Sequence, residues 1–511
     1  MSLHLGIDAG TQSIKCLVID TETGGIAAES TAAFAKDFPE YHSPEGFIPT
    51  ADALIRHADP MMWVDALELA LERLKGSRID LKKIKSISGS GQQHGSVYLA
   101  APLPAYTGGK KLSDQLRPCL SRPTAPIWMD RSTAEICKDL NRAFGSRIIE
   151  STGSPAIERF TGPQIRAFYL REEKAYRNTS KIHLVSSFLC SVLCGAHAPI
   201  DYGDGAGMNL LNLHSLNWDQ EIAAYTAPDL LEKLPEPVPG GTVAGYLSGY
   251  FSRFGLTPGI PVAVWTGDNP GSLIGTGCFE PGTSGISMGT SDTVFMPMKT
   301  FCTDPEKYGH VFGNPAGGFM SLICFTNGSL AREKIKDLHH ADWTFFDKTA
   351  CSQTPPGNNG KLMLPYFSPE NTPLILAPEV IRNYTSCTAA EDIRAILESQ
   401  VLAKRLHSQW IPEEIRRIRL TGGASNSPAI QQIIADVFNA EVETLQAANS
   451  AALGGAMLAA SCSENTPLPE LAAMFSRGKT VAVPSSGSHA VYQKMLTAYR
   501  ELESNYPKYR A

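Results

Sequence analysis

The sequence has no long hydrophobic run, no secretory signal and no excess of basic residues. None of its apolar runs reaches the roughly 18 residues that a membrane-spanning helix needs. Its first residues also lack the basic flank and apolar segment of a secretory signal. Lys and Arg total 45 against 51 Asp and Glu, so a net charge of −6 provides no overall basic surface. We therefore expect a protein that binds neither nucleic acid nor a membrane.

The 11 cysteines contain no CxxC pair, and their number is odd. Cys190 and Cys194 lie one helical turn apart in an apolar run, a pattern typical of buried free thiols rather than of a metal site. Scattered, unpaired thiols favour a reducing compartment. The sequence therefore predicts a cytoplasmic protein.

The length allows two or three domains. At about 150 residues per domain, 511 residues give three, whereas α/β domains of more than about 200 residues give two. A hydrophobic content of 43% and a charged content of 19% are ordinary for globular proteins and exclude a wholly disordered chain.

Apolar periodicity predicts alternating strands and helices. Residues Leu3–Asp8 and Ile14–Asp20 are expected to form a β-hairpin, and Ile84–Ser88 a further strand. An amphipathic helix is expected after Pro60, because apolar residues recur there at helical spacing. A new strand is expected at Val262–Asn269. This alternation is typical of an α/β fold.

A weak internal repeat suggests two similar lobes. Residues 7–13 (IDAGTQS) resemble residues 286–292 (ISMGTSD), and in each case an apolar strand precedes Gly-Thr and another apolar strand follows. A composition change near residue 256 places the boundary, so the expected lobes are residues 1–256 and 257–511. Each lobe would then contain a hairpin near its beginning.

The two hairpin tips are candidate phosphate-binding loops. Gly, Thr and Ser leave backbone N–H groups accessible to an oxyanion. Asp8 stands at the mouth of the first tip, and Lys15 follows it. A single tip of this kind would more simply be a turn, but two matched tips favour phosphate binding.

Three further motifs follow expected strands. Asp268, in TGDN, could accept a proton from a substrate hydroxyl, or could simply cap the next helix. His94, preceded by two glutamines, suits a polyhydroxylated ligand, although a lone histidine is more often structural. The glycine turn Thr421–Asn426 precedes a helix and could lie flat against a ligand, or be only a turn.

Several known motifs are absent from the sequence. There is no GxxxxGK[ST] P-loop, no protein-kinase DFG or HRD signature and no HExxH zinc motif. Residues 285–289 match the G-x-S-x-G nucleophile elbow, which would make Ser287 a hydrolase nucleophile. A strand, not a helix, is expected after Ser287, so this alternative is disfavoured.

The motifs together resemble those of the FGGY carbohydrate kinases, and within that family the xylulose kinases typical of eukaryotes. The resemblance implies a two-lobed actin/hexokinase/Hsp70-like ATPase fold, with ribonuclease H-like lobes and a cleft between them. It extends from residue 6 to about residue 455. The segments that carry it are GIDAGTQSIK, SGSGQQHGS, ERFTG, PIDYGDGAGMNLL, TGDNPGSL, SMGTSDTVF, FTNGSLAREKI and TGGASN.

The resemblance implies a role for each matching residue. Asp268 would be the general base that deprotonates the 5-hydroxyl of D-xylulose during phosphorylation by ATP, and Asp8 and Asp268 would be the acids near Mg²⁺. The sugar ligands would be His94, Gln93, Arg159, Asp268 and Asn269. The nucleotide ligands would be Thr11, Gln12, Ser13, Gly289, Thr290, Trp343, Gly422, Gly423 and Asn426.

The sequence departs from the family pattern at two places. QQHG replaces the QMHG of bacterial xylulose kinases, and residues 365–374 (PYFSPENTPL) replace a Gly-Glu-Arg-Thr-Pro-His run. The Asp-Asn pair at 268–269 resembles xylulose kinases, whereas glycerol kinases carry Asp-Gln. Phosphorylation of another ketose or polyol, and a non-catalytic sugar or nucleotide sensor, remain alternatives. The partners implied are a small sugar and ATP, and the resemblance is compatible with a homodimer.

Overall fold

The computed structural model describes residues 2–445 and 449–506, without the side chains of residues 349–351. Contacts within the chain divide it into two compact units, each built from three separate stretches of sequence. Composition places the boundary near residue 256, whereas the first continuous stretch of the first unit ends at Gly277. The first unit comprises Met1–Gly277, Val311–Phe319 and Asn449–Ser476, and the second comprises Cys278–His310, Met320–Ala448 and Arg477–Ala511.

A seven-stranded sheet forms the centre of the first unit. Its strands follow the order β13-β14-β5-β1-β2-β3, and β15 also pairs with β5. β1 is antiparallel to β2 and parallel to β5, which confirms the hairpin predicted at the beginning of the sequence. The strands are β1 (Leu3–Ala9), β2 (Ser13–Asp20), β3 (Gly25–Ala33), β5 (Ile84–Gly91), β13 (Val243–Tyr246), β14 (Pro261–Ala263) and β15 (Thr266–Gly267).

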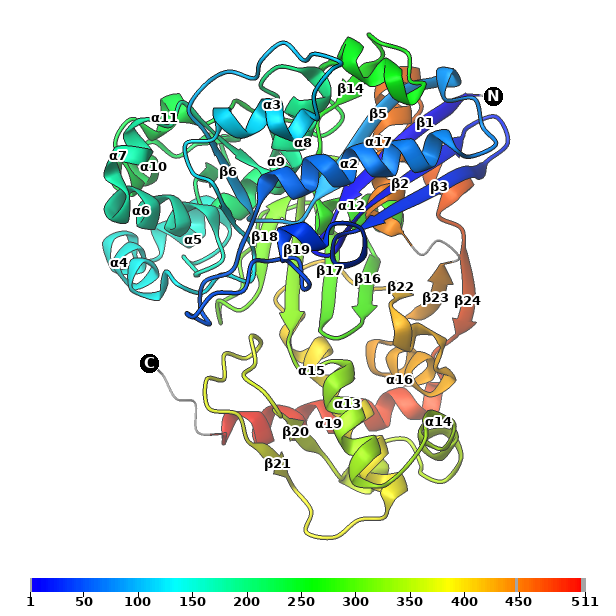
Figure 1. Ribbon diagram of the computed structural model, residues 1–511. Coiled ribbons are helices and arrows are strands. Elements are labelled where there is room, and N and C mark those ends of the chain that lie inside the picture. Colours follow the sequence, from blue (N-terminus) through cyan, green and yellow to red (C-terminus); the bar gives the residue numbers. More distant parts are fainter. Residues whose placement is uncertain (1, 446–448, 507–511) are drawn as a thin grey trace. The chain divides into compact units, whose positions relative to one another are not determined.

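Helices pack on both faces of this sheet, as Figure 1 shows for α2 and α17. The predicted amphipathic helix is α2 (Pro60–Lys75), and the Asp59 carboxylate caps it by accepting a hydrogen bond from the Met61 amide at 2.9 Å. α17 (Ser450–Glu464) approaches β1 so closely that a Cβ on Gly6 would lie 1.9 Å from the Ala452 carbonyl oxygen. A glycine is therefore required in β1 for this helix to pack there.

The other elements of the first unit are short. Its further strands are β4 (His57–Ala58), β6 (Ser96–Leu99), β7 (Ala125–Pro126), β8 (Lys181–Leu184), β9 (Ile200–Asp201), β10 (Leu211–Asn212), β11 (Asn217–Trp218) and β12 (Pro237–Val238). Its further helices are α1 (Phe34–Asp37), α3 (Leu112–Leu116), α4 (Ala134–Phe144), α5 (Arg147–Thr152), α6 (Thr161–Arg171), α7 (Glu173–Arg177), α8 (Val185–Cys194), α9 (Tyr202–Gly205), α10 (Gln220–Thr226), α11 (Leu230–Lys233), α12 (Asp268–Gly275) and α18 (Leu468–Phe475).

The strand expected at residues 262–269 is interrupted. β14 and β15 both pair with β5, but the chain leaves the sheet between them, where the Val264 amide donates to the Thr242 carbonyl at 2.8 Å. The buried Trp265 ring lies at the interruption and occupies the space beside Gly89, where a Cβ would lie 2.8 Å from the indole. The apolar run 262–265 gives no sign of this interruption in the sequence.

A second seven-stranded sheet has the order β18-β19-β17-β16-β22-β23-β24. Its strands are β16 (Thr283–Met288), β17 (Asp292–Met298), β18 (His310–Gly313), β19 (Phe319–Phe325), β22 (Arg417–Thr421), β23 (Glu441–Leu445) and β24 (Gly478–Ala482). By the division above, most of β18 is counted with the first unit. The second unit further contains β20 (Met363–Pro365), β21 (Val380–Arg382), α13 (Ser329–Leu338), α14 (Trp343–Ser352), α15 (Ala389–His407), α16 (Pro428–Phe438) and α19 (Ser486–Ser504).

The two sheets repeat the same strand order. β3-β2-β1-β5-β14 in the first corresponds to β19-β17-β16-β22-β23 in the second. In each sheet the central hairpin is antiparallel, and its first strand pairs in parallel with a later strand. Both tips also close through a glycine amide, with Gly10 donating to the Ser13 carbonyl at 3.0 Å and Gly289 to the Ser291 carbonyl at 3.2 Å. The short sequence repeat therefore marks a repeated fold.

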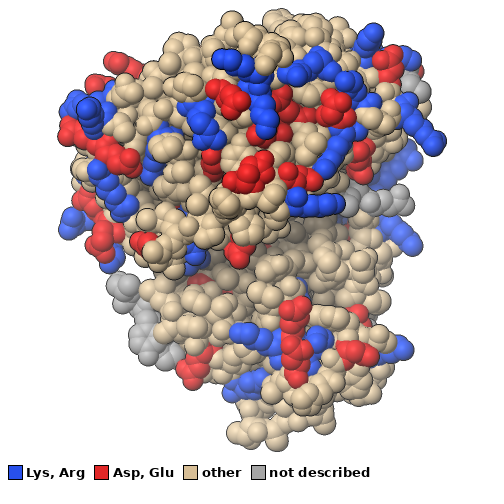
Figure 2. Space-filling model, in the orientation of Figure 1, with Lys and Arg blue, Asp and Glu red and all other residues tan. Residues whose placement is uncertain are grey.

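The surface and the cysteines agree with the composition. On the face that Figure 2 shows, positively and negatively charged side chains are interspersed. All the cysteines whose side chains the structure describes are free. Among the residues that the structure describes, no helix is both long and apolar enough to cross a membrane.

A buried histidine in the second unit makes its stability depend on pH. His407 Nε2 lies 3.2 Å from a Glu503 carboxylate oxygen, and Nδ1 lies 3.4 Å from Glu306. Burial alone would lower the pKa of His407, but hydrogen bonds to Glu306 and Glu503 raise it to about 9. The folded pKa thus exceeds the unfolded one, so the stabilisation is complete below about pH 6.5 and is lost as the pH rises through about 9.

We expect His407→Gln to destabilise the protein mainly at low pH. The gap in unfolding free energy between wild type and variant should narrow by about 3 kcal/mol between about pH 6 and pH 10, because only the wild type loses a proton from the buried site. Urea titrations across this range measure the gap. A gap that stays constant with pH would show that His407 is neutral in the folded protein.

Candidate functional site

The tip of the first hairpin holds three of the predicted phosphate ligands. Thr11 and Ser13 are half-buried and Gln12 is exposed. Thr11 is fixed from two sides. Trp128 Nε1 donates to its hydroxyl at 2.8 Å, and Gly46, at φ +86°, lies so close that a Cβ there would be 1.9 Å from the Thr11 carbonyl oxygen. Contacts with residues distant in sequence therefore fix the conformation of the tip.

Asp8 is the last residue but one of β1, the strand that leads into this tip. Its Oδ1 accepts a hydrogen bond from the Ser90 hydroxyl at 2.8 Å. Burial raises the pKa of Asp8, while the Ser90 hydrogen bond and the nearby positive charge of Lys15 oppose the shift. Burial therefore raises the energy of the ionised carboxyl, and a bound cation would stabilise that form.

Asp268 and Asn269 begin α12, where β15 ends. Asp268 Oδ1 accepts from the Asn269 amide at 2.8 Å and from Asn269 Nδ2 at 3.0 Å, and the same Nδ2 lies 3.0 Å from Gln93 Oε1. Burial, and then the charge of Asp8, raise the pKa of Asp268 to about 7. A carboxylate whose pKa lies near neutrality is suited to take a proton from a hydroxyl.

His94 lies beside this pair in an orientation set by the backbone. Its φ of +70° is in the left-handed region, and Thr161 donates to its carbonyl oxygen at 2.9 Å. The ring is 3.0 Å from the Gly207 carbonyl through Nδ1, which must therefore be the protonated nitrogen. Burial, and then the positive charge of Arg159, lower the pKa of His94 to about 3. The neutral ring thus presents Nε2 as an acceptor for a ligand hydroxyl.

Arg159 completes the predicted sugar-binding set. It is half-buried, and its guanidinium lies 5.6 Å from the centre of the Phe160 ring, which in turn lies 4.6 Å from the His94 ring. Arg159 is therefore near His94, in agreement with its effect on the histidine pKa. The first unit thus brings together Asp8, Gln93, His94, Arg159, Asp268 and Asn269.

We expect His94→Asn to weaken sugar binding selectively. Asparagine tolerates the left-handed backbone at this position but cannot place an acceptor where Nε2 lies. Loss of one hydrogen bond of about 1–1.5 kcal/mol should raise the KM for the sugar about tenfold. Steady-state kinetics measure the effect, with the KM for ATP as the internal control. An unchanged sugar KM in a variant with the wild-type melting temperature would remove His94 from the site.

Two buried acids that sequence reasoning gave no role lie behind this set. Asp204 is fully buried, and a Cβ on Gly267 would lie 2.9 Å from its Oδ1 and 2.5 Å from Gln93 Cγ. Ser186 donates to Asp204 Oδ2, whereas Oδ1 has no hydrogen-bond partner among the described residues. Asp201 supports this group, because it accepts from the Asp204 amide and from the Thr266 hydroxyl, each at 2.9 Å.

The sequence gives only a weak indication that Asp201 and Asp204 lie at the site. Both lie in the segment PIDYGDGAGMNLL, which carries the family resemblance. Their position beside Gly267 depends on the packing of α9 against β15, which no local pattern reveals.

The second unit holds the predicted nucleotide ligands other than the first hairpin tip. Gly422 follows β22 at φ +87°, and a Cβ there would lie 2.4 Å from the Met288 carbonyl oxygen, so only glycine fits. Gly423 differs, because a Cβ on it would meet no atom within 4 Å. Asn426 is exposed at the end of the turn Gly423–Asn426. The open space at Gly423 leaves room for a flat ligand to lie against the backbone.

Trp343 is connected to this turn through α14. Its ring is 45% exposed and packs edge-on against Phe346 at 5.3 Å. One turn further along α14, Asp347 accepts a hydrogen bond at 2.5 Å from the hydroxyl of Ser427, the residue after Asn426. Ser427 is the N-cap residue of α16, but its hydroxyl donates to Asp347 rather than accepting from a helix amide. This contact holds α14 beside the glycine turn.

The tip of the second hairpin is exposed in the same unit. Thr290 is exposed and Gly289 half-buried, and a Cβ on Gly289 would meet only the Ser291 carbonyl, at 3.5 Å. The strand β17 follows this tip, so Ser287 does not stand at a strand-to-helix turn. The hydrolase alternative therefore lacks the geometry of a nucleophile elbow.

A pair of carboxylates, rather than a cluster, is available for a metal ion. Among the described residues, no group of three or more His, Cys, Asp or Glu side chains is placed to hold one. Asp8 and Asp268 nevertheless interact, since the charge of Asp8 raises the pKa of Asp268. Mg²⁺ usually binds one or two carboxylates and completes its shell with water and substrate phosphate. The two residues fit that ion.

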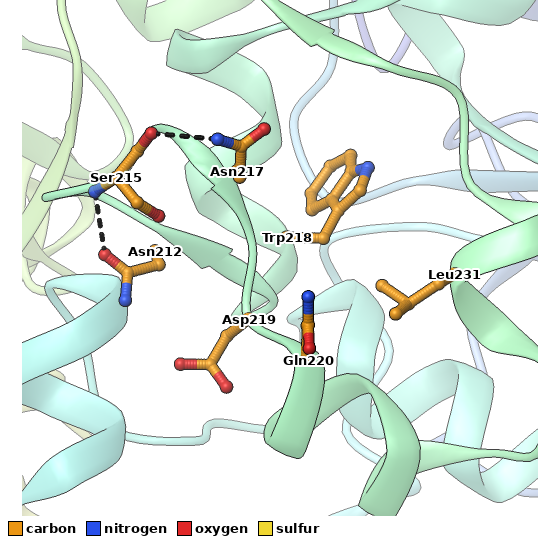
Figure 3. Close-up of a pocket in the computed structure, with 7 residues that line it drawn as sticks. All are labelled: Asn212, Ser215, Asn217, Trp218, Asp219, Gln220 and Leu231. Carbon is orange, nitrogen blue, oxygen red and sulfur yellow. Dashed lines mark hydrogen bonds between the residues drawn. The ribbon is translucent and has the colours of Figure 1, made fainter.

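A separate hollow of about 500 Å³ lies in the first unit, along β10 and β11 (Figure 3). Two of its asparagine side chains bond to the backbone of the chain itself. Asn217 Nδ2 donates to the Ser215 carbonyl at 3.1 Å, and Asn212 accepts from the Ser215 amide at 3.0 Å. None of the predicted site residues lines it; its lining residues are Asn212, Ser215, Asn217, Trp218, Asp219, Gln220 and Leu231.

Two family models match nearly the whole chain. The N-terminal domain of the FGGY family of carbohydrate kinases matches residues 3–275, and the C-terminal domain matches residues 285–462. The chain belongs to this family. The match confirms the resemblance drawn from the motifs, and makes the protein a carbohydrate kinase.

Curated relatives cover almost the full length of this FGGY kinase. The xylulose kinase of Rattus norvegicus is 38% identical over 98% of the chain and 96% of the relative. Xylulose kinase 2 of Arabidopsis thaliana is 38% identical over 90% of the chain and 87% of the relative. The match to mammalian and plant enzymes agrees with the eukaryotic type of resemblance.

Solved structures confirm the fold of the FGGY kinase. A ligand-bound xylulose kinase from Lactobacillus acidophilus has a TM-score of 0.85 at 20% identity, over 99% of this chain and 98% of that one. A gluconate kinase from the same organism has the same TM-score at 21% identity, over 98% of this chain and 97% of that one. The actin/hexokinase-like ATPase fold is therefore established, and the fold alone does not select the sugar.

Proposed function

We propose that this FGGY kinase transfers the γ-phosphoryl group of ATP to the 5-hydroxyl of D-xylulose, giving D-xylulose 5-phosphate and ADP. The observation that carries the proposal is the half-buried Asp268 carboxyl at the start of α12, hydrogen-bonded to Asn269, which also contacts Gln93. Phosphoryl transfer depends on positioning and charge stabilisation more than on covalent chemistry. A carboxylate that orients and deprotonates one hydroxyl is the group that this reaction requires.

The polar residues around Asp268 would bind the sugar. Neutral His94 offers Nε2 as an acceptor for one hydroxyl, and Arg159 offers donors for an oxygen. Gln93 Nε2 is buried and has no partner within the described chain, so it is free to donate to a further oxygen. Together these groups would hold the 5-hydroxyl against Asp268.

Each unit contains candidate ligands of the nucleotide. Thr11, Gln12 and Ser13 at one hairpin tip, and Gly289 and Thr290 at the other, would hold phosphate oxygens through amides and hydroxyls. The adenosine would be bound by Gly422, Gly423, Asn426 and Trp343. Asp8 and Asp268 would hold Mg²⁺, which neutralises phosphate charge when bound. A mildly acidic protein can bind ATP in this way without a basic surface.

Two lines of support favour xylulose over other sugars. The curated relatives at 38% identity are xylulose kinases, and the chain carries Asp-Asn at 268–269. The fold likeness does not choose, because gluconate and glycerol kinases share it. The proposal also places the enzyme in the cytoplasm and allows a homodimer, which light scattering measures.

An ADP-release screen tests the proposal. Purified protein with Mg-ATP should release ADP fastest with D-xylulose, and more slowly with L-xylulose, D-ribulose, L-ribulose, glycerol and D-fructose. Equal rates on all six would contradict the sugar and leave the kinase class. No ADP release with any sugar, from protein that binds both ATP and a sugar, would favour the sensor alternative.

A further inference from the structure

A buried ion triad joins the second hairpin to two helices of its unit. Asp292 is the first residue of β17, directly after the tip Gly289–Ser291, and it is fully buried. Its Oδ2 lies 2.8 Å from Lys404 Nζ, on α15, and 3.3 Å from Arg332 Nη1, on α13. Both basic side chains are also almost wholly buried. The first residue after the exposed tip is thus held by charges on two helices.

The start of α13 contacts the tip a second time. The Ser329 amide, the first of the helix, donates to the Gly289 carbonyl at 2.8 Å. Gly328 lies so close to the tip that a Cβ there would be 2.6 Å from the Thr290 carbonyl oxygen and 2.9 Å from Asp292 Oδ1. The path of the tip is therefore determined by where α13 begins.

Gln400 links the triad to this same turn. Its Oε1 accepts from Arg332 Nη1 at 2.8 Å, and its Nε2 donates to the carbonyls of Asn327 at 2.7 Å and Gly328 at 3.1 Å. Buried Glu370 holds the turn from the other side by accepting from the Asn327 amide at 3.0 Å. Glu370 belongs to the segment 365–374, which departs from the family pattern, so this segment has a structural role here.

Stability alone does not account for the triad. Taking three charges out of water is unfavourable, and apolar residues of similar size often stabilise a core as well or better. Two polar atoms, Asp292 Oδ1 and Arg332 Nη2, are buried without a hydrogen-bond partner in the described chain. Buried charged pairs instead fix the relative orientation of the segments that carry them, because the interaction is favourable only when the groups are correctly oriented.

We propose that Asp292, Arg332 and Lys404 are positioning residues that fix the Gly289–Ser291 tip in the conformation that binds the phosphates of ATP. They set the affinity for the nucleotide without contacting the sugar. A tip already in its binding conformation loses less conformational freedom when the ligand binds. The inference rests on the proposed kinase function, since it assigns the tip to the nucleotide.

Asp292→Asn tests the inference, with Mg-ADP as the probe. The substitution keeps the shape and removes the charge that holds Lys404 and Arg332. We expect the dissociation constant for Mg-ADP, measured by calorimetry, and the KM for ATP to rise at least about tenfold, as preorganisation is lost. The KM for D-xylulose should stay within about twofold. A merely structural role would lower the melting temperature without separating the two KM values.

The chain offers a matched control and a second variant. The control is Glu398→Gln, which breaks another buried ion pair on α15, the helix that carries Lys404. Glu398 accepts a hydrogen bond from Arg394 Nε at 2.6 Å, and its substitution should leave ADP binding unchanged.

The second variant, Gly328→Ala, keeps the charges of Asp292, Arg332 and Lys404 and displaces the tip directly, so it should also weaken ADP binding. If Asp292→Asn does not fold, the ADP affinity of Gly328→Ala is the deciding measurement.

The outcomes separate the two levels of the proposal. Wild-type ADP affinity in folded Asp292→Asn, or in Gly328→Ala if the former does not fold, would overturn the positioning role. A wild-type protein that binds no Mg-ADP would instead contradict the kinase function itself. Weaker ADP binding in Glu398→Gln, equal to that in Asp292→Asn, would also overturn the inference, because any buried charge change would then have the same effect.

Discussion

Asp268→Ala is expected to lower kcat at least about 100-fold, the lower end for loss of a general base. The carboxyl stands at the start of α12 beside Asn269, and the neighbouring acids Asp8 and Asp204 are engaged by the hydroxyls of Ser90 and Ser186. ADP release at saturating sugar and ATP measures the effect. Asp80→Ala is the control, since that exposed acid only caps a short helical turn and should keep full activity.

The same variant should not lose stability. The folded pKa of Asp268, about 7, lies above its ordinary value of 3.8, so at neutral pH the ionised carboxyl disfavours the folded state. Removing it should leave the melting temperature, measured without Mg²⁺, unchanged or higher. A variant that keeps near-normal turnover would contradict the assignment of Asp268. A variant that is inactive only because it melts lower would contradict the electrostatic account.

Gly454→Ala is expected to destabilise the protein by about 3 kcal/mol, the upper part of the range for overpacking a core. Gly454 lies on α17 where that helix crosses α12, and a Cβ there would be 2.0 Å from the Gly271 carbonyl oxygen and 3.0 Å from the Gly275 amide. Both contacts are with backbone, which cannot rotate away. α12 must therefore move, and it carries Asp268 at its first position.

Urea unfolding measures this effect, and kcat should fall with it because the general base is displaced. Gly249→Ala is the matched control, since a Cβ at that position of the first unit meets no atom within 4 Å. A Gly454→Ala variant as stable as the control would show that α12 and α17 are not packed as closely as the structure has them. A destabilised variant with full kcat would show that Asp268 does not depend on this contact.

Local sequence patterns predicted the elements that carry the chemistry. The two Gly-Thr tips, the helix after Pro60 and the candidate residues His94 and Asp268 each follow from a short local pattern, whereas the role of Asn269 was implied only by the family resemblance. The repeat between residues 7–13 and 286–292 also predicted a hairpin in each of two similar lobes, and the structure has both hairpins, in sheets of corresponding strand order.

Other features depend on contacts between distant parts of the chain. α17 returns from residue 450 to pack on β1 through Gly6, so the first unit is discontinuous and no composition change near 256 could reveal it. Trp265 interrupts a strand that looks continuous in sequence. Asp204 and Asp292 are ordinary acids until packing removes them from water. Each of these residues has at least one neighbour that defines its role and lies more than 50 residues away, such as Lys404 for Asp292 and Gly267 for Asp204.

The most direct test of the account is the identity of the product. Wild-type protein incubated with D-xylulose and Mg-ATP should yield a sugar phosphate whose phosphorus correlates with the C5 methylene protons in a proton–phosphorus NMR spectrum, together with one ADP per sugar. Asp268→Ala should give no such signal in the same time. Phosphate attached to another carbon, or inorganic phosphate formed without any sugar phosphate, would contradict the central claim.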